Sequence, residues 1–179
     1  MPKIYIDWGY GVGYEDFDCY EIAKNMFDKL QNNGIPVNIR SRSGNKVSLE
    51  DRLSLIERSN ADILIVIDVN WSDNTNQKGI ETYYRDSSKR GELLAKKIQK
   101  ELVKATKLYN RGIISCNNKT HPNIIRLIES NETAVVSLIG FYSNPYERLI
   151  MEQNQYKKMI SDGICDGILE YLKIKGIFM

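Results

Sequence analysis

"ADILIVIDVN", residues 61–70, carries the strongest strand signal in the chain and decides the fold class. Its residues are apolar at nearly every position, which is typical of a strand in a parallel sheet covered on both faces. Further strand patterns at 3–7, 35–42, 79–85 and 133–141 alternate with helical ones. This alternation predicts an α/β fold in three layers, with a mostly parallel, twisted sheet and helices on both faces.

Helical segments are indicated by apolar residues that recur at spacings of three and four. In the segment 47–60, Leu49 and Ile56 lie on one face. Ser48 stands at its N-cap position and Asp51 follows three residues later, a capping-box arrangement that predicts where the helix begins. Further helices are predicted over 19–34, 87–108 and 154–176, and a short strand is expected within 121–130.

Length and net charge narrow the class of protein. The chain has 179 residues without an internal repeat, low-complexity segment or linker, which predicts a single domain spanning residues 1–179. Its formal net charge of +2 offers little attraction for nucleic acid or an anionic membrane. The N-terminus lacks an apolar stretch long enough for a signal peptide or a membrane span. The chain is therefore expected to be cytosolic, to leave the cell by another route, or to be a domain cut from a longer secreted protein.

The side chains best suited to zinc are few. Cys19, Cys116 and Cys165 are odd in number and far apart. This argues against a disulfide scaffold or a cysteine-based zinc site, so each is expected to be a small buried residue. The sole histidine, His121, precedes Pro122 in a polar loop and is expected to be exposed. A His-dependent triad or a two-histidine metal site therefore cannot be built from this chain alone.

A binding site is expected beyond the carboxyl ends of the parallel strands. The first strand ends at Asp7 and runs into the turn "WGYGVG" (8–13), which lacks the residues of a P-loop or a dinucleotide fingerprint. The third strand ends in "IDVN" (67–70) and the last in "SLIGF" (137–141). If these strands are neighbours, one pocket is rimmed by Tyr10, Glu15, Asp68 and Leu138.

Simpler interpretations of the two acidic residues stay open at this point. Asp68 is as well suited to capping the turn after its strand as to binding a ligand. Glu15 is equally consistent with a solvated acid or with a charge in the first turn of a helix, where it favours the helix dipole.

Several motifs along nearly the whole chain carry a family resemblance. They are "VSLEDRLSLIERSNADILIVIDVN" (47–70), "KGIETYYR" (78–85), "SKRGELLAKKIQKELVKAT" (88–106), "NRGI" (110–113), "GFYSNPYE" (140–147) and "DGILEYL" (166–172). In these stretches the chain resembles the zinc-dependent N-acetylmuramoyl-L-alanine amidases. Those bacterial enzymes cut the bond between the sugar and the stem peptide of peptidoglycan. The resemblance implies a zinc-hydrolase sheet flanked by helices.

The chain departs from the family at the motifs that bind zinc. The first family motif, D-P-G-H-G-G, holds a zinc-binding histidine; here it reads "DWGYGV", with Trp8 in place of the proline and Tyr10 in place of the histidine. The resemblance implies that the second ligand, a glutamate, falls on Glu15. The third ligand is the histidine of a strand-end I-H-x-N, where Asp68 replaces the histidine and Asn70 matches.

The family's catalytic glutamate, in a strand ending V-E-L-G-F, is also replaced. Leu138 occupies its position in "VSLIGF" (136–141), and a slip of one residue would offer Ser137 or Ile139, neither of which is a carboxylate. Leucine cannot carry a proton, so no intact catalytic residue is expected. The resemblance then implies a binding cleft formed by Trp8, Tyr10, Glu15, Asp68, Asn70 and Leu138.

The replaced ligands change the metal that the site would prefer. Tyr10, Glu15 and Asp68 would form an all-oxygen site, which suits Mg²⁺ or Ca²⁺ better than the family's zinc. The tyrosine would first have to lose a proton whose pKa is about 10. We therefore expect no bound cofactor, with an oxygen-ligated Mg²⁺ or Ca²⁺ as the lesser alternative.

Three functions are consistent with these residues. The first is a catalytically degenerate amidase homologue that binds peptidoglycan or its stem peptide, or that regulates or partners another cell-wall protein. The alternative is an active cell-wall amidase with atypical metal ligands. The third is a binder of a small ligand or of another oxygen-ligated metal, whose identity nothing in the sequence indicates.

Overall fold

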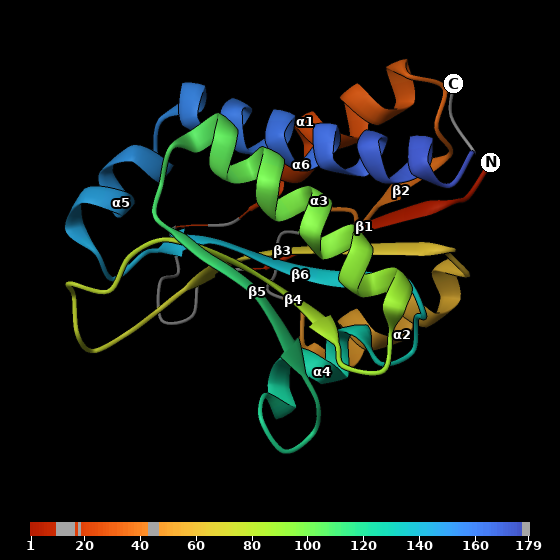
Figure 1. Cartoon of the computed structure of the whole chain (residues 1–179), viewed down its shortest axis with the longest axis horizontal. Coiled ribbons are helices and arrows are strands. Elements are labelled where there is room, and N and C mark those ends of the chain that lie inside the picture. Colours follow the sequence, from red (N-terminus) through yellow and green to blue (C-terminus); the bar gives the residue numbers. More distant parts are fainter. Residues whose placement is uncertain (10–16, 18, 43–46, 177–179) are drawn as a thin grey trace.

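A six-stranded sheet lies between two layers of helices (Figure 1). The computed structural model describes residues 1–9, 17, 19–42 and 47–176. The strands stand in the order β2-β1-β3-β6-β4-β5. Their bounds are β1 (Ile4–Trp8), β2 (Val37–Ile39), β3 (Ile63–Asn70), β4 (Ile80–Arg85), β5 (Asn110–Cys116) and β6 (Ala134–Phe141). The helices are α1 (Tyr20–Asn32), α2 (Leu49–Ser59), α3 (Lys89–Thr106), α4 (Pro122–Ile128), α5 (Pro145–Met151) and α6 (Asn154–Ile174). The predicted α/β fold class, with a mostly parallel sheet in three layers, is confirmed.

The direction of the strands changes once across the sheet. Strands β2, β1, β3 and β6 are parallel neighbours, whereas β4 runs antiparallel to β6 and parallel to β5. The carboxyl ends of β1, β3 and β6 therefore share one edge of the sheet with the amino ends of β4 and β5. Residues that begin β4 and β5 are thus brought beside residues that end β3 and β6.

Each face of the sheet has its own apolar core. Helices α1, α3 and α6 cover one face, and α2 and α4 cover the other (Figure 1). The larger core includes Trp8, Ile65 and Ile98, and the smaller one includes Val66 and Leu138. Alternate residues of β3 therefore enter different cores, as expected for a strand that is covered on both sides.

Helix α6 packs closely across α3 through two glycines. A Cβ atom added at Gly167 would lie 2.5 Å from the Cα of Ile98, and one at Gly163 would lie 2.9 Å from the Cα of Leu102. Both distances are shorter than carbon atoms tolerate, so only glycine permits this approach of the two backbones.

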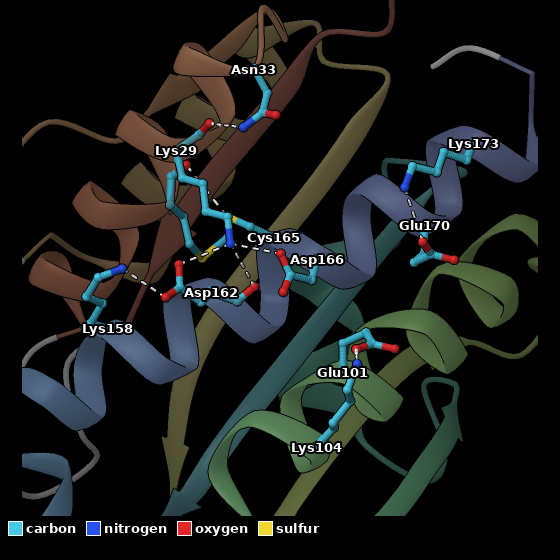
Figure 2. Close-up of polar contacts among 11 residues, drawn as sticks. Lys29, Asn33, Glu101, Lys104, Lys158, Asp162, Cys165, Asp166, Glu170 and Lys173 are labelled. Atoms are coloured by element: carbon cyan, nitrogen blue, oxygen red, sulfur yellow. Dashed lines mark hydrogen bonds and ion pairs between the residues drawn. The ribbon is translucent and has the colours of Figure 1, made fainter. Parts of the chain in front are cut away.

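Charged side chains join α6 to α1 on the outside of the molecule (Figure 2). Lys29 of α1 lies between two carboxylates of α6, 3.0 Å from Asp162 and 2.8 Å from Asp166. Lys158 adds a second contact to Asp162 at 2.9 Å. Because these groups are partly exposed, each pair contributes about 1 kcal/mol or less, and the apolar core holds the helices together.

Several local predictions are confirmed. The Ser48 hydroxyl accepts a hydrogen bond from the Asp51 backbone N–H at 3.1 Å, so α2 begins where the capping pattern indicated. Cys19, Cys116 and Cys165 are all buried, and none of the three forms a disulfide. Within the part of the chain that the structure describes, no helix is long and apolar enough to cross a membrane.

The segment 121–130 is a correction, because it forms helix α4 rather than a short strand. Pro122 stands at the first helical position, where the fixed φ of proline favours a helix and its missing N–H is not needed. Ile125 and Ile128, three residues apart, then pack into the smaller core. Helical spacing and the placement of the proline therefore determine the outcome.

Two further elements were not predicted. Strand β5 is a half-exposed edge strand whose apolar residues are few, so its pattern is weak. Helix α5 is short, but the residues that cap it could have indicated where it begins. The Asn144 side chain accepts from the backbone N–H groups of Tyr146 and Glu147, and Pro145 stands at the first position.

Candidate functional site

Three side chains from adjacent strands form one row at the carboxyl edge of β3 and β6. Asp68 of β3 pairs in register with Leu138 of β6, and Leu138 pairs with Glu81 of β4. Residues paired in register point to the same face of a sheet. Leu138 belongs to the smaller core, so this row lies on the face that α2 and α4 cover. The structure thus brings Asp68 and Leu138 together as expected, and it adds Glu81.

Asp68 stands half-buried against the end of β1. Its Oδ1 accepts a hydrogen bond from the Val69 backbone N–H at 2.9 Å. A Cβ atom added at Gly9 would lie 2.0 Å from the Asp68 carboxyl carbon, so the absence of a side chain at Gly9 makes room for this carboxyl group. Burial raises the pKa of Asp68 to about 6, against the opposing effect of Arg52, and the charge of Asp7 adds to the increase.

Asp7 is fully buried and is held by two arginines. The Nε of Arg40 lies 2.5 Å from Oδ1, and the Nε of Arg52 lies 2.8 Å from Oδ2. Arg40 also donates to the backbone carbonyl of Trp8. These contacts tie β1 to α2 and to the residue that follows β2, and they place positive charge near Asp68.

Trp8 is a correction, because it does not line an accessible cleft. Its side chain is fully buried in the larger core, on the face opposite the row. Its Nε1 donates to the Arg40 carbonyl at 2.9 Å, and the Arg40 guanidinium carbon lies 3.9 Å from the ring centroid. The strand period of two places Asp7 and Trp8 on different faces, and the Trp8 side chain packs in the larger core.

Two of the predicted cleft residues, Tyr10 and Glu15, lie outside the described residues. Asn70 is described and half-buried, and its side-chain amide donates to the Glu81 carboxylate at 2.7 Å. Leu138 is only 8% exposed. Among the described members of the predicted cleft, Asp68 and Asn70 therefore offer the polar groups.

Glu81 was missed by the sequence reasoning, although it is central to the row. Its side chain is 4% exposed and accepts three side-chain hydrogen bonds. The donors are the Asn70 amide at 2.7 Å, the Tyr83 hydroxyl at 2.8 Å and the Arg111 Nε at 2.7 Å. Burial, together with the bond to Glu81, raises the pKa of Tyr83. The alternation within 80–85 already placed Glu81 and Tyr83 on the same face of the strand. A charged residue on a face that is otherwise buried could have identified Glu81 as a candidate site residue.

Glu147 is a second buried carboxylate that sequence reasoning did not single out. It accepts from the backbone N–H groups of Gly79 at 2.7 Å and Phe141 at 2.6 Å. Burial raises its pKa, and these two backbone donors oppose the increase. The contacts attach the start of β4 to the end of β6, which fixes the spacing of the row.

His121 is a further correction, because it is half-buried rather than exposed. Its ring lies edge-on to Tyr83, with 4.9 Å between the ring centroids, and it occupies the N-cap position of α4. The edge-on contact with an aromatic ring accounts for its position.

The match to known proteins covers nearly the whole chain. Residues 9–170 match the N-acetylmuramoyl-L-alanine amidase family. The chain belongs to this amidase family. Its similarity to the germination-specific N-acetylmuramoyl-L-alanine amidase of Bacillus subtilis (strain 168) is 28% identity over 202 residues, covering 97% of this chain and 81% of the relative.

Solved amidase structures share the fold of this amidase-family chain. The N-acetylmuramoyl-L-alanine amidase from Clostridium difficile 630 superposes with a TM-score of 0.83 and 28% identity, covering 98% of this chain and 99% of the other. The catalytic domain of CwlV from Bacillus (Paenibacillus) polymyxa var. colistinus gives 0.81 at 24% identity, covering 97% and 99% of the two chains. The second comparison bears on the fold alone.

The described residues of this amidase-family chain fit the family's zinc poorly. Catalytic zinc takes three protein ligands, mostly imidazole with a carboxylate. At the end of β3, where the family has a histidine, the chain offers the carboxyl oxygen of Asp68. The side-chain amide of Asn70 already donates a hydrogen bond to Glu81. Across the described ranges no three His, Cys, Asp or Glu side chains are grouped so that they would hold a metal ion.

Proposed function

We propose that this amidase-family protein is catalytically degenerate and binds peptidoglycan, through its stem peptide, at the edge formed by Asp68, Leu138 and Glu81. In this role it would regulate or partner a cell-wall enzyme rather than cut the wall itself. The observation that carries the proposal is the position of Leu138. It stands in the row between two carboxylates, where the family resemblance places the catalytic glutamate.

The chemistry of the row supports binding more than hydrolysis. Amide cleavage in a zinc hydrolase requires a metal-bound water and a group that handles its proton. Leu138 offers no proton acceptor, and Asp68 offers oxygen where the family has imidazole nitrogen. Glu81 is the other carboxylate of the row, but Asn70, Tyr83 and Arg111 already donate hydrogen bonds to its oxygens.

One observation favours an active enzyme as the second candidate. Burial raises the pKa of Asp68 to about 6. A carboxylate that titrates near neutral pH is suited to general acid–base catalysis. An active amidase with atypical ligands would use Asp68 in this way, with a metal held partly by Tyr10 or Glu15.

A paired assay separates the two candidates. Purified protein is sedimented with insoluble peptidoglycan, with cellulose as the control polymer, and dye release from labelled peptidoglycan is measured in parallel. We expect retention on peptidoglycan without dye release, with or without added zinc. Dye release that Asp68→Asn abolishes would favour the active enzyme, and failure to bind or cleave would overturn the proposal.

A metal assay on protein purified without chelator completes the test. We expect less than stoichiometric zinc, because the described residues offer a single strand-end carboxylate and no imidazole at this edge. One tightly held zinc per chain would contradict the proposed loss of the zinc site.

A further inference from the structure

Arg111, at the start of β5, is held rigidly beside the row. Its Nε donates to Glu81 at 2.7 Å, and its Nη1 donates to the Gln77 side chain at 3.1 Å and to the Lys78 carbonyl at 3.4 Å. Its guanidinium carbon lies 5.0 Å from the ring centroid of Phe141, which ends β6. These four contacts thus hold the plane of this guanidinium group in place.

The outer edge of the same group faces solvent. The Arg111 side chain is 30% exposed, whereas Glu81 beneath it is 4% exposed. Counting the described residues alone, the Nη2 atom of Arg111 has no hydrogen-bond partner. A guanidinium held at one edge and open at the other is ready to bind an anion, because little side-chain entropy remains to be lost.

The surrounding charge also favours an anion. The Glu81 carboxylate balances the charge of Arg111, but its oxygens are shared with Asn70 and Tyr83 and are buried. Lys78 is exposed next to Arg111 and makes no ion pair within the described part of the chain. The accessible rim therefore has positive charge, with the compensating negative charge beneath it.

We propose that Arg111 binds a carboxylate group of the stem peptide, at the end of the row that runs from Asp68 through Leu138 to Glu81. The inference rests on the proposed function and assigns one end of the bound peptide. A guanidinium edge matches the planar geometry of a carboxylate, which accepts paired N–H bonds. The peptide carboxylate would approach from solvent, on the exposed side of Arg111.

The test compares soluble muramyl peptides in which each carboxylate is amidated in turn. Affinities are measured by isothermal titration for the parent and for Arg111→Gln. We expect amidation of one carboxylate to weaken binding to the parent about tenfold, the usual effect of losing a charge-assisted hydrogen bond, and to leave Arg111→Gln unaffected. The series also identifies which carboxylate is recognised.

Two further variants serve as controls for this test. Arg111→Lys retains a positive charge beside Glu81 but lacks the planar fork, so we expect it to fold like the parent and to lose most of the discrimination. Arg126→Gln, an exposed arginine of α4 paired with Glu50, should keep the discrimination of the parent. Thermal unfolding of each variant checks that the fold is retained.

The outcomes distinguish this inference from the proposed function. If the parent binds all peptides equally, or if Arg111→Gln and Arg111→Lys discriminate as the parent does, the role of Arg111 is overturned while peptide binding stands. If the parent binds none of the peptides, the proposed function fails and the inference fails with it.

Discussion

Leu138 and Asp68 are directly paired across β6 and β3, so an apolar side chain stands beside a carboxyl group at the edge where the family places its site. The same register pairs Leu138 with Glu81 on its other side. A leucine between two acids keeps them separated by an apolar surface. Under the proposed function, this leucine also stands in place of the group that the amidase reaction would need.

Restoring the family's ligands should restore zinc binding before it restores hydrolysis. In Tyr10→His/Asp68→His, two imidazoles and Glu15 would give the ligand set of zinc hydrolases. We expect zinc affinity to rise at least about tenfold over the parent, while remaining weaker than in a working enzyme because the substitutions do not restore the groups that orient the ligands. Isothermal titration with zinc measures it.

The matched controls for this repair are the two single variants, each of which supplies one imidazole. Zinc affinity no better in the double variant than in either single variant would mean that the three positions do not converge. Activity on labelled peptidoglycan is expected only after Leu138→Glu is added.

The raised pKa of Asp68 predicts a pH-dependent loss of stability. Its pKa is 3.8 when unperturbed and about 6 in the folded protein, so folding favours the protonated form. The contribution of Asp68 is therefore fully present below about pH 4 and is lost as the pH rises through about 6. After allowance for partial exposure we expect a change of about 1–3 kcal/mol.

Asp68→Asn should remove this dependence, because an amide does not titrate and its oxygen can still accept from Val69. Urea unfolding between pH 4 and 7 should show the variant gaining stability relative to the parent as the pH rises. Asp73→Asn, at an exposed loop position, serves as the control. A constant difference between Asp68→Asn and the parent across this range would refute the assignment.

Asp7→Asn should destabilise the protein strongly. The substitution leaves Arg40 and Arg52 buried without their shared negative partner, and breaking such a buried pair costs about 3–5 kcal/mol. Denaturant unfolding at neutral pH measures the loss. Asp28→Asn, which breaks an exposed pair with Lys24, should cost about 0.5 kcal/mol or less. Similar losses in the two variants would show that the Asp7 cluster is not important for stability.

Gly167→Ala should destabilise the contact between α6 and α3. The added Cβ would lie 2.5 Å from the Cα of Ile98, so the helices must move apart, at a cost of about 1–3 kcal/mol. Alanine otherwise favours a helix over glycine, so a loss of stability would report the close packing alone. Thermal unfolding is the measurement, with Lys173→Ala on the exposed side of α6 as the control. An increase in melting temperature for Gly167→Ala would contradict the predicted clash.

Local interactions explain which parts of the fold could be predicted. The uninterrupted apolar run of β3 indicated a strand covered on both faces, and the structure places its residues in two cores. Ser48 and Asp51 indicated the start of α2, because a cap depends on residues three apart. The strand expected near Ile125 was wrong, since short β-branched runs fit helices and strands alike and tertiary packing decides between them.

The sequence by itself determined the fold class and the family, because these depend on residue identity and on short-range periodicity. The positions at which the chain departs from the family's site stay a prediction from the sequence. Only the tertiary structure decided which residues meet. Trp8 is directed into the core rather than a cleft, and Glu81 lies beside Leu138 and Arg111. The physical reason is that β4 and β5 run antiparallel to β6, an arrangement that is set by long-range packing. Residues that begin β4 and β5 therefore lie beside residues that end β3 and β6.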